Sequence, residues 1–153
     1  MQLLPIDFSP YASALRIKRQ DGQRWVFDPI RRKYLVLTPE EFVRQLLLHH
    51  FIHDCQYNPN RISVERKLLV NGLERRYDVL VFDLQMAPFL LVECKAPEVE
   101  LDQSTCDQIA RYNMTLQVPY LMMTNGRSNL CCQMDYKEKQ YEYLNQLPAY
   151  PSH

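Results

Sequence analysis

The chain has 153 residues, 46% hydrophobic and 24% charged, and its 18 basic and 18 acidic side chains cancel. That composition fits one globular domain with a buried core, and the apolar runs are far too short to cross a bilayer. Zero net charge removes the simplest argument for a nucleic-acid-binding protein, which is a strongly basic domain.

Two further features of composition point to the cell interior. Residues 1–10 lack the basic start and long apolar stretch of a signal peptide. The five cysteines are odd in number and form no CxxC pair, which argues against a disulfide framework and against a cysteine zinc site. We therefore expect a cytoplasmic protein with reduced thiols and no membrane association.

Residues 1–37 predict a strand-rich N-terminal extension. Ala14 to Val26 suggests a hairpin around the "DGQ" turn, and "KYLVL" suggests another short strand. Basic side chains outnumber Asp7, Asp21 and Asp28 here; they are Arg16, Lys18, Arg19, Arg24, Arg31, Arg32 and Lys33. The excess could contact phosphates, but on its own it predicts only a solvated surface.

Residues 38–135 predict the core of the domain. Thr38 is expected to cap a helix running to about His53, and Glu41 three residues later completes a capping box. A three-stranded meander should follow, and Asp102 should cap a second helix to about Met114. The meander strands are expected at 62–70, 73–83 and 88–95, and later strands at "PYLMMT", "LCCQMD" and "YEYL".

These elements predict one α/β domain spanning 1–153, with a mixed central sheet flanked by helices in the order αβββαβ. Residues 136–153 would form a closing strand and tail.

Strand register brings four charged side chains of the meander together. Asn71-Gly72 is a favoured two-residue hairpin turn, and counting outward from it sets Glu65 opposite Asp78. A hairpin centred between Gln85 and Met86 would set Asp78 opposite Glu93. Because side chains alternate along a strand, Lys95 shares a face with Glu93.

Acidic side chains on strands about 4.8 Å apart repel one another unless a cation lies between them. Mg²⁺ suits such a site because it takes oxygen ligands from one or two carboxylates and keeps several waters. Lys95 could then hold the attacking water or offset charge on a phosphate. The alternative is an ordinary charge pair at a strand end, with Asp78 as an exposed polar residue.

These motifs resemble the PD-(D/E)xK nuclease superfamily, in Tyr77-Asp78 and in "ECK" from Glu93 to Lys95. "QIARY" from Gln108 to Tyr112 is similar to the QxxxY motif of its RecB-like branch. Within the superfamily, "VFDPIRRKYLVLTPEEFVRQ", "LVECKAP" and "DQIARYN" look like the N-terminal nuclease domain of type I restriction enzyme restriction (R) subunits. Tyr77 stands where the superfamily's name has proline, and the chain has no GxxxxGK[ST] phosphate loop of a motor.

The resemblance implies a restriction-endonuclease-like fold and a Mg²⁺-dependent DNA endonuclease of a restriction-modification system, in which Mn²⁺ may replace Mg²⁺. Asp78, Glu93 and the backbone carbonyl of Cys94 would be metal ligands, and Lys95 the catalytic lysine. Gln108 and Tyr112 would support the site and position DNA. Helical spacing independently lets Arg111 lean toward the same surface as these two residues.

A first-helix glutamate often completes the metal site in this superfamily. We favour Glu65 as the accessory acid over Glu41, because the capping box already accounts for Glu41. Two other interpretations stay open. His49 and His53 have the spacing of a helical zinc pair, and the domain could be a catalytically silent DNA-binding or assembly module that serves a separate helicase or translocase subunit.

Overall fold

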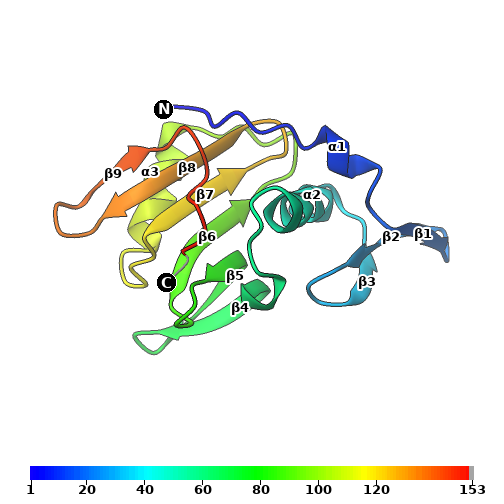
Figure 1. The fold of residues 1–153 in the computed structure, drawn as a ribbon, viewed down its shortest axis with the longest axis horizontal. Coiled ribbons are helices and arrows are strands. Elements are labelled where there is room, and N and C mark those ends of the chain that lie inside the picture. The colour runs from blue at the N-terminus through cyan, green and yellow to red at the C-terminus, as the bar shows by residue number, and fades with distance from the viewer. Residues whose placement is uncertain (152–153) are drawn as a thin grey trace.

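A computed structural model describes residues 1–151, and of Tyr112 only the backbone. Strands β1 to β3 form a small sheet beside α2, and β4 to β9 form a six-stranded sheet (Figure 1). The strands are β1 (Ile17–Gln20), β2 (Gln23–Asp28), β3 (Lys33–Val36), β4 (Ile62–Val70), β5 (Leu73–Phe82), β6 (Pro88–Cys94), β7 (Tyr120–Thr124), β8 (Asn129–Asp135) and β9 (Gln140–Tyr143). The helices are α1 (Ser9–Ala12), α2 (Pro39–His53), the 3₁₀ turn η1 (Pro59–Arg61) and α3 (Gln103–Tyr112).

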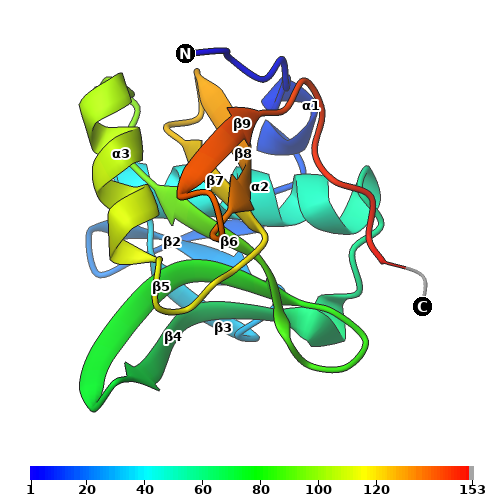
Figure 2. The same cartoon turned by 90° about the vertical axis from the view of Figure 1, so that its left-hand side faces the viewer.

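The six-stranded sheet is mixed, because β6 and β7 are parallel while its other neighbouring strands are antiparallel. A parallel pair needs a crossover connection, and α3 lies in that connection. Helices α2 and α3 cover opposite faces of the sheet (Figure 2). The predicted α/β class with a mixed sheet between helices is confirmed.

Side chains of β6 alternate between two cores. Leu90 and Val92 belong to the larger cluster, which contains Leu47 of α2, whereas Leu91 packs in a second cluster with Ala110 of α3. Strands covered on both faces read as continuous apolar runs, which explains "FLLV". Glu93 follows Leu91 by two positions, so alternation directs it to the α3 face.

The predicted Asn71-Gly72 turn fixes the register of β4 on β5. Both residues have positive φ, 51° and 77°, as a primed two-residue turn requires. The pairs that follow, from Val70 opposite Leu73 onward, have the predicted register. The second predicted register is observed from Val81 opposite Leu90 to Val79 opposite Val92, but not beside the turn, where a shift between Val81 and Phe82 sets Phe82 opposite Pro88.

The caps of the two long helices are only partly as predicted. Thr38 accepts a 3.0 Å hydrogen bond from the Glu41 N–H, and Asp102 accepts one of 2.8 Å from the Thr105 N–H. The reciprocal half of the capping box is wrong, because the Glu41 carboxylate turns inward to Arg31 and Arg44. Two guanidinium partners, one of them buried, stabilise a carboxylate more than one backbone amide does.

The cysteines and the helices bear on two expectations from the sequence, which are reduced thiols and apolar runs too short to cross a bilayer. All five cysteines are free, and four of them are buried. Within residues 1–151, none of the helices combines the length and apolarity that crossing a bilayer requires.

Candidate active site

The ladder between β5 and β6 opens at Asp78. Regular pairing ends at Val79 opposite Val92, and the amide of Cys94, two residues further along β6, donates instead to Asp78 Oδ2 at 2.8 Å. Strand β6 stays paired with β7 at this level, and the Lys95 N–H continues the pairing by donating to the Thr124 carbonyl at 2.8 Å. The Asp78 carboxylate therefore lies where β5 and β6 separate.

Strand β4 is irregular at the same level. Glu65 has a φ of 51°, and the pairs on either side of it are Arg66 opposite Tyr77 and Val64 opposite Val79. A positive φ at a residue other than glycine is uncommon in a strand, and such an irregularity re-aims the side chain. The structure thus places Glu65 across from Asp78, as the register predicts, and its side chain is 40% exposed.

Asp78 and Glu93 form a carboxyl pair. Burial, the charge of Asp78 and a hydrogen bond to Asp78 raise the pKa of Glu93 to about 8, although the Lys95 ammonium acts in the opposite direction. A nearby carboxylate disfavours ionisation of a buried one, so Glu93 keeps its proton to a higher pH than a free glutamate does. A bound cation would take the place of that proton.

The donor set at this pair suits Mg²⁺. Within residues 1–151 there is no group of three or more His, Cys, Asp or Glu side chains arranged to hold a metal ion. Mg²⁺ needs fewer, because one or two carboxylates suffice when water or substrate oxygens complete the octahedron. The contact between Cys94 and Asp78 is made by the Cys94 N–H, and the role of the Cys94 carbonyl as a further oxygen ligand stays a prediction.

Glu40, in the first turn of α2, is an acid at this site that the sequence analysis missed. Burial and the nearby Asp78 carboxylate raise the pKa of Glu40, while Arg44 and Lys95 oppose the rise. The neighbouring residue Glu41 points elsewhere, since consecutive helical residues are about 100° apart. Two adjacent glutamates opening a helix were the available signal, and only the packing of α2 shows which one faces the sheet.

Arg44 joins α2 to the carboxylates of the sheet. Its guanidinium is 2.8 Å from Glu41, 3.5 Å from Glu65 and 3.4 Å from Asp78, and its side chain is only 4% exposed. Burial opposes the charge, but the surrounding carboxylates, Glu41 first among them, raise the pKa of Arg44. Arg44 therefore holds Asp78 in place. No pattern in the sequence had indicated this role for Arg44.

A second buried ion network ties the small sheet to α2. Asp28 is fully buried at the end of β2 and accepts hydrogen bonds from Arg31 and from the Gln45 side chain. Burial opposes its charge, yet the Arg31 and Gln45 hydrogen bonds lower the pKa of Asp28. Arg31 also contacts Glu41 at 2.9 Å, so β2 is connected to Asp78 through Arg31, Glu41 and Arg44.

Helix α3 carries the predicted DNA-positioning residues. Gln108 and Arg111 are exposed on it, while the side chain of Tyr112 lies outside the described residues. None of the hydrogen bonds among residues 1–151 joins Gln108 or Arg111 to the carboxyl pair. Their exposure leaves both side chains accessible to solvent.

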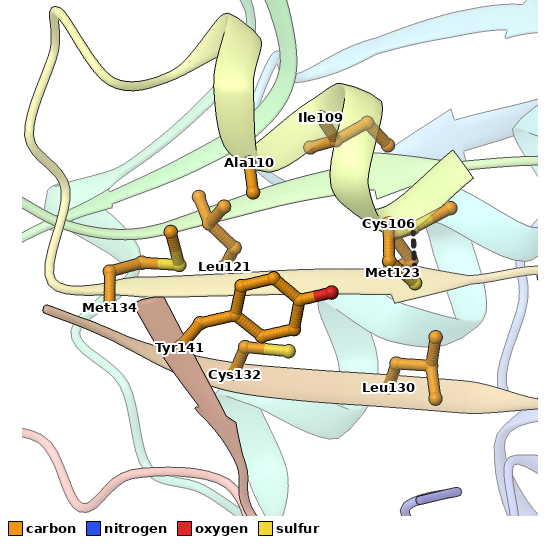
Figure 3. A pocket seen from close by; sticks show the side chains of 9 residues that line it. All are labelled: Cys106, Ile109, Ala110, Leu121, Met123, Leu130, Cys132, Met134 and Tyr141. Carbon is orange, nitrogen blue, oxygen red and sulfur yellow. Dashed lines mark hydrogen bonds between the residues drawn. The ribbon is translucent and has the colours of Figure 1, made fainter. Parts of the chain in front are cut away.

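The best-defined pocket lies elsewhere, between α3 and strands β7 to β9 (Figure 3). Its volume is about 20 Å³, and its apolar lining includes Ala110, Leu121 and Leu130. A cavity of that size and polarity is a packing void. It does not contain the carboxyl pair and contributes nothing to the candidate chemistry.

The histidines of α2 pack as aromatic rings. His49 and His53 stack with centroids 5.6 Å apart, and Tyr11 of α1 stacks on both. Burial and the charge of His53 lower the pKa of His49. This arrangement explains the helical HxxxH spacing by packing, and the zinc alternative gains no support among the described side chains.

Comparisons with known proteins agree on one kind of domain. Residues 39–148 match the family described as type I restriction enzyme R protein N terminus (HSDR_N). A Vibrio vulnificus YJ016 structure, described as a fragment of a proposed HsdR subunit of a type I restriction enzyme, has a TM-score of 0.50 and 19% identity. The match covers 74% of this chain and 24% of that one, so this chain spans about a quarter of its length. No curated protein matches significantly.

Proposed function

Because the chain belongs to the family of type I restriction enzyme R protein N termini, we propose that it is a Mg²⁺-dependent deoxyribonuclease with a PD-(D/E)xK site of the QxxxY branch. The observation that carries the proposal is the position of the Asp78 carboxylate where β5 and β6 separate, bonded to the Cys94 N–H and close enough to Glu93 to raise its pKa. A buried acid with a strongly raised pKa beside a specific partner is a recognised mark of a functional site.

Each residue of the site would have a separate role in phosphodiester hydrolysis. Asp78 and Glu93 would hold the cation, with the Cys94 carbonyl beside them and Glu40 or Glu65 as the accessory acid. When bound, Mg²⁺ supplies positive charge that offsets the two carboxylates and the charge growing on the phosphate. Glu93 would be ionised when it holds the cation.

The Lys95 ammonium is a positive charge close to the carboxylates of the site. It shares a strand face with Glu93, and its ammonium acts on the ionisation of both Glu93 and Glu40. An ammonium in this position can donate hydrogen bonds to a phosphate oxygen or to the attacking water. Lys95 is therefore the proposed catalytic lysine, and Arg44 is a positioning residue that acts through Asp78.

Substrate contacts would come from α3. Gln108 and Arg111 are exposed on the helix that covers the Glu93 face of the sheet, and we include Tyr112 by its place in the motif. These groups can donate hydrogen bonds to phosphate oxygens. DNA is the proposed substrate, and a separate translocating subunit of a restriction system is the proposed partner.

The test is cleavage of supercoiled plasmid and of labelled single-stranded DNA by purified protein in Mg²⁺ or Mn²⁺. Lys95→Ala and EDTA should each abolish cleavage, while Lys137→Ala, an exposed lysine of the β8–β9 turn, should cleave like wild type. Cleavage that persists in Lys95→Ala would refute the assignment of the site. If folded wild-type protein binds DNA but leaves both substrates intact, the chain is instead a silent DNA-binding or assembly module.

A further inference from the structure

The face of the small sheet that points away from the core carries aromatic and basic side chains. Cross-strand pairing places Lys18 opposite Trp25 and Phe27 opposite Tyr34. The Phe27 N–H donates to the Arg16 carbonyl at 2.9 Å, which extends the same register by one pair. Residues directly opposite each other share a sheet face. We call this surface the outer face: Arg16, Lys18, Trp25, Phe27 and Tyr34.

The opposite face of the small sheet anchors it to the domain. Val26 is fully buried in the larger core cluster, and Asp28 is fully buried in the ion network with Arg31. Alternation along β2 therefore turns Trp25 and Phe27 outward. Both rings and that of Tyr34 are half-buried, and within residues 1–151 none of the three packs in a core cluster.

Two cations of the outer face are held over its rings. The Arg16 guanidinium lies 4.4 Å from the centroid of Phe27, and the Lys18 ammonium lies 4.1 Å from that of Tyr34. Phe27 and Tyr34 contact each other edge to face at 5.3 Å. Cation–π contacts with the rings hold these two exposed positive charges on the outer face. Among residues 1–151, no Arg or Lys side chain lies over the Trp25 ring.

The charge of this region favours an anionic partner. Residues 16–33 contain seven Arg and Lys against Asp21 and Asp28, whereas the whole chain is neutral. Asp28 is buried and already bonded to Arg31. An anionic chain with flat apolar groups matches both the cations and the uncovered ring, and unpaired bases present such groups while duplex bases do not.

We propose that the outer face binds single-stranded DNA, with phosphates contacting Arg16 and Lys18 and a base stacking on Trp25. The inference extends the proposed function and rests on it for the identity of the nucleic acid. The ion network from Asp28 through Arg31 to Glu41 attaches this surface rigidly to α2, which carries Glu40 and Arg44 of the candidate active site. A strand held here would lie on an element fixed relative to the carboxyl pair.

Trp25 is the only tryptophan and therefore reports binding directly. The experiment titrates oligo-dT into the wild-type chain in EDTA, where cleavage cannot occur, and follows tryptophan fluorescence at several KCl concentrations. We expect saturable quenching that weakens with salt. The double variant Arg16→Gln/Lys18→Gln should bind on the order of tenfold more weakly, with a salt slope smaller by about 1.4, since each single-strand phosphate contact contributes about 0.7.

Matched variants separate these residues from charge in general. Lys137→Ala should bind like wild type, and Arg16→Lys/Lys18→Arg should recover most of the affinity. Absence of quenching, equal weakening by Lys137→Ala, or stronger quenching by duplex than by oligo-dT would overturn the proposal. Plasmid cleavage without quenching would refute DNA binding at the outer face and leave the proposed nuclease activity intact. Quenching without cleavage would refute the nuclease activity and leave DNA binding at the outer face intact.

Discussion

The titration of Glu93 makes the stability of the metal-free protein depend on pH. Its pKa rises from 4.5 to about 8 on folding because of burial and Asp78. Between those pH values the folded chain binds a proton that the unfolded chain releases. Stability therefore falls as pH rises through this window, because the native state binds more protons there.

The size of the effect follows from the two pKa values. At about 1.4 kcal/mol per pKa unit, a rise from 4.5 to about 8 corresponds to at most about 5 kcal/mol. The proton belongs to the pair with Asp78, so the loss measured for Glu93 alone should be about 2 to 5 kcal/mol. Glu93→Gln keeps the shape of the side chain and removes the titration.

Urea unfolding in EDTA at pH 5.5 and pH 9 covers about 2.5 units of this window in both chains, so the loss between these two pH values should be at most about 3.5 kcal/mol. Wild type should lose stability relative to Glu93→Gln on going to pH 9, and Glu93→Gln should be the more stable at pH 9. Comparing the two chains removes the contribution of the histidines, which titrate in both. Parallel stabilities at the two pH values would refute the proton-sharing pair.

Three other substitutions test neighbouring parts of the account. Arg44→Ala removes one of the two guanidinium partners of Glu41 and should lower the free energy of unfolding by about 2 to 3 kcal/mol in urea, whereas a loss below about 1 kcal/mol would contradict the network. Thr38→Ala should cost about 1 kcal/mol in the same assay and Thr38→Ser much less, because serine keeps the cap; equal losses would contradict the cap. Gln108→Ala should slow DNA cleavage without changing the melting temperature, since its side chain is exposed; unchanged cleavage would remove Gln108 from DNA positioning.

Local chemistry made the sheet register predictable. Asn71-Gly72 adopts the two positive φ angles of a primed turn, and from there the pairing count places Glu65 and Asp78 opposite each other. The second register agrees with the prediction for a different reason: the connection, residues 83–87, is one residue shorter than expected, and a register shift between Val81 and Phe82 compensates for it. Turn residues determine these features within a few positions of chain.

The contribution of α2 to the site could not be read in the same way. Which of Glu40 and Glu41 faces the sheet depends on the rotation of α2 against β5 and β6, and no short-range signal reports that rotation. Arg44 and Arg31 form ion pairs with residues distant in the chain, such as Asp78 and Glu65. Their roles emerge only once the sheet and helix are packed together.

The central claim, that Asp78 and Glu93 form a cation site, is tested most directly by calorimetric titration of Mg²⁺ into the protein at pH 7 in two buffers of different ionisation enthalpy. With a pKa of about 8, Glu93 is about nine-tenths protonated at pH 7. The account predicts one Mg²⁺ per chain and release of about 0.9 proton, with no release in Glu93→Gln and no binding in Asp78→Asn. Binding without proton release, or equal binding to both variants, would contradict it.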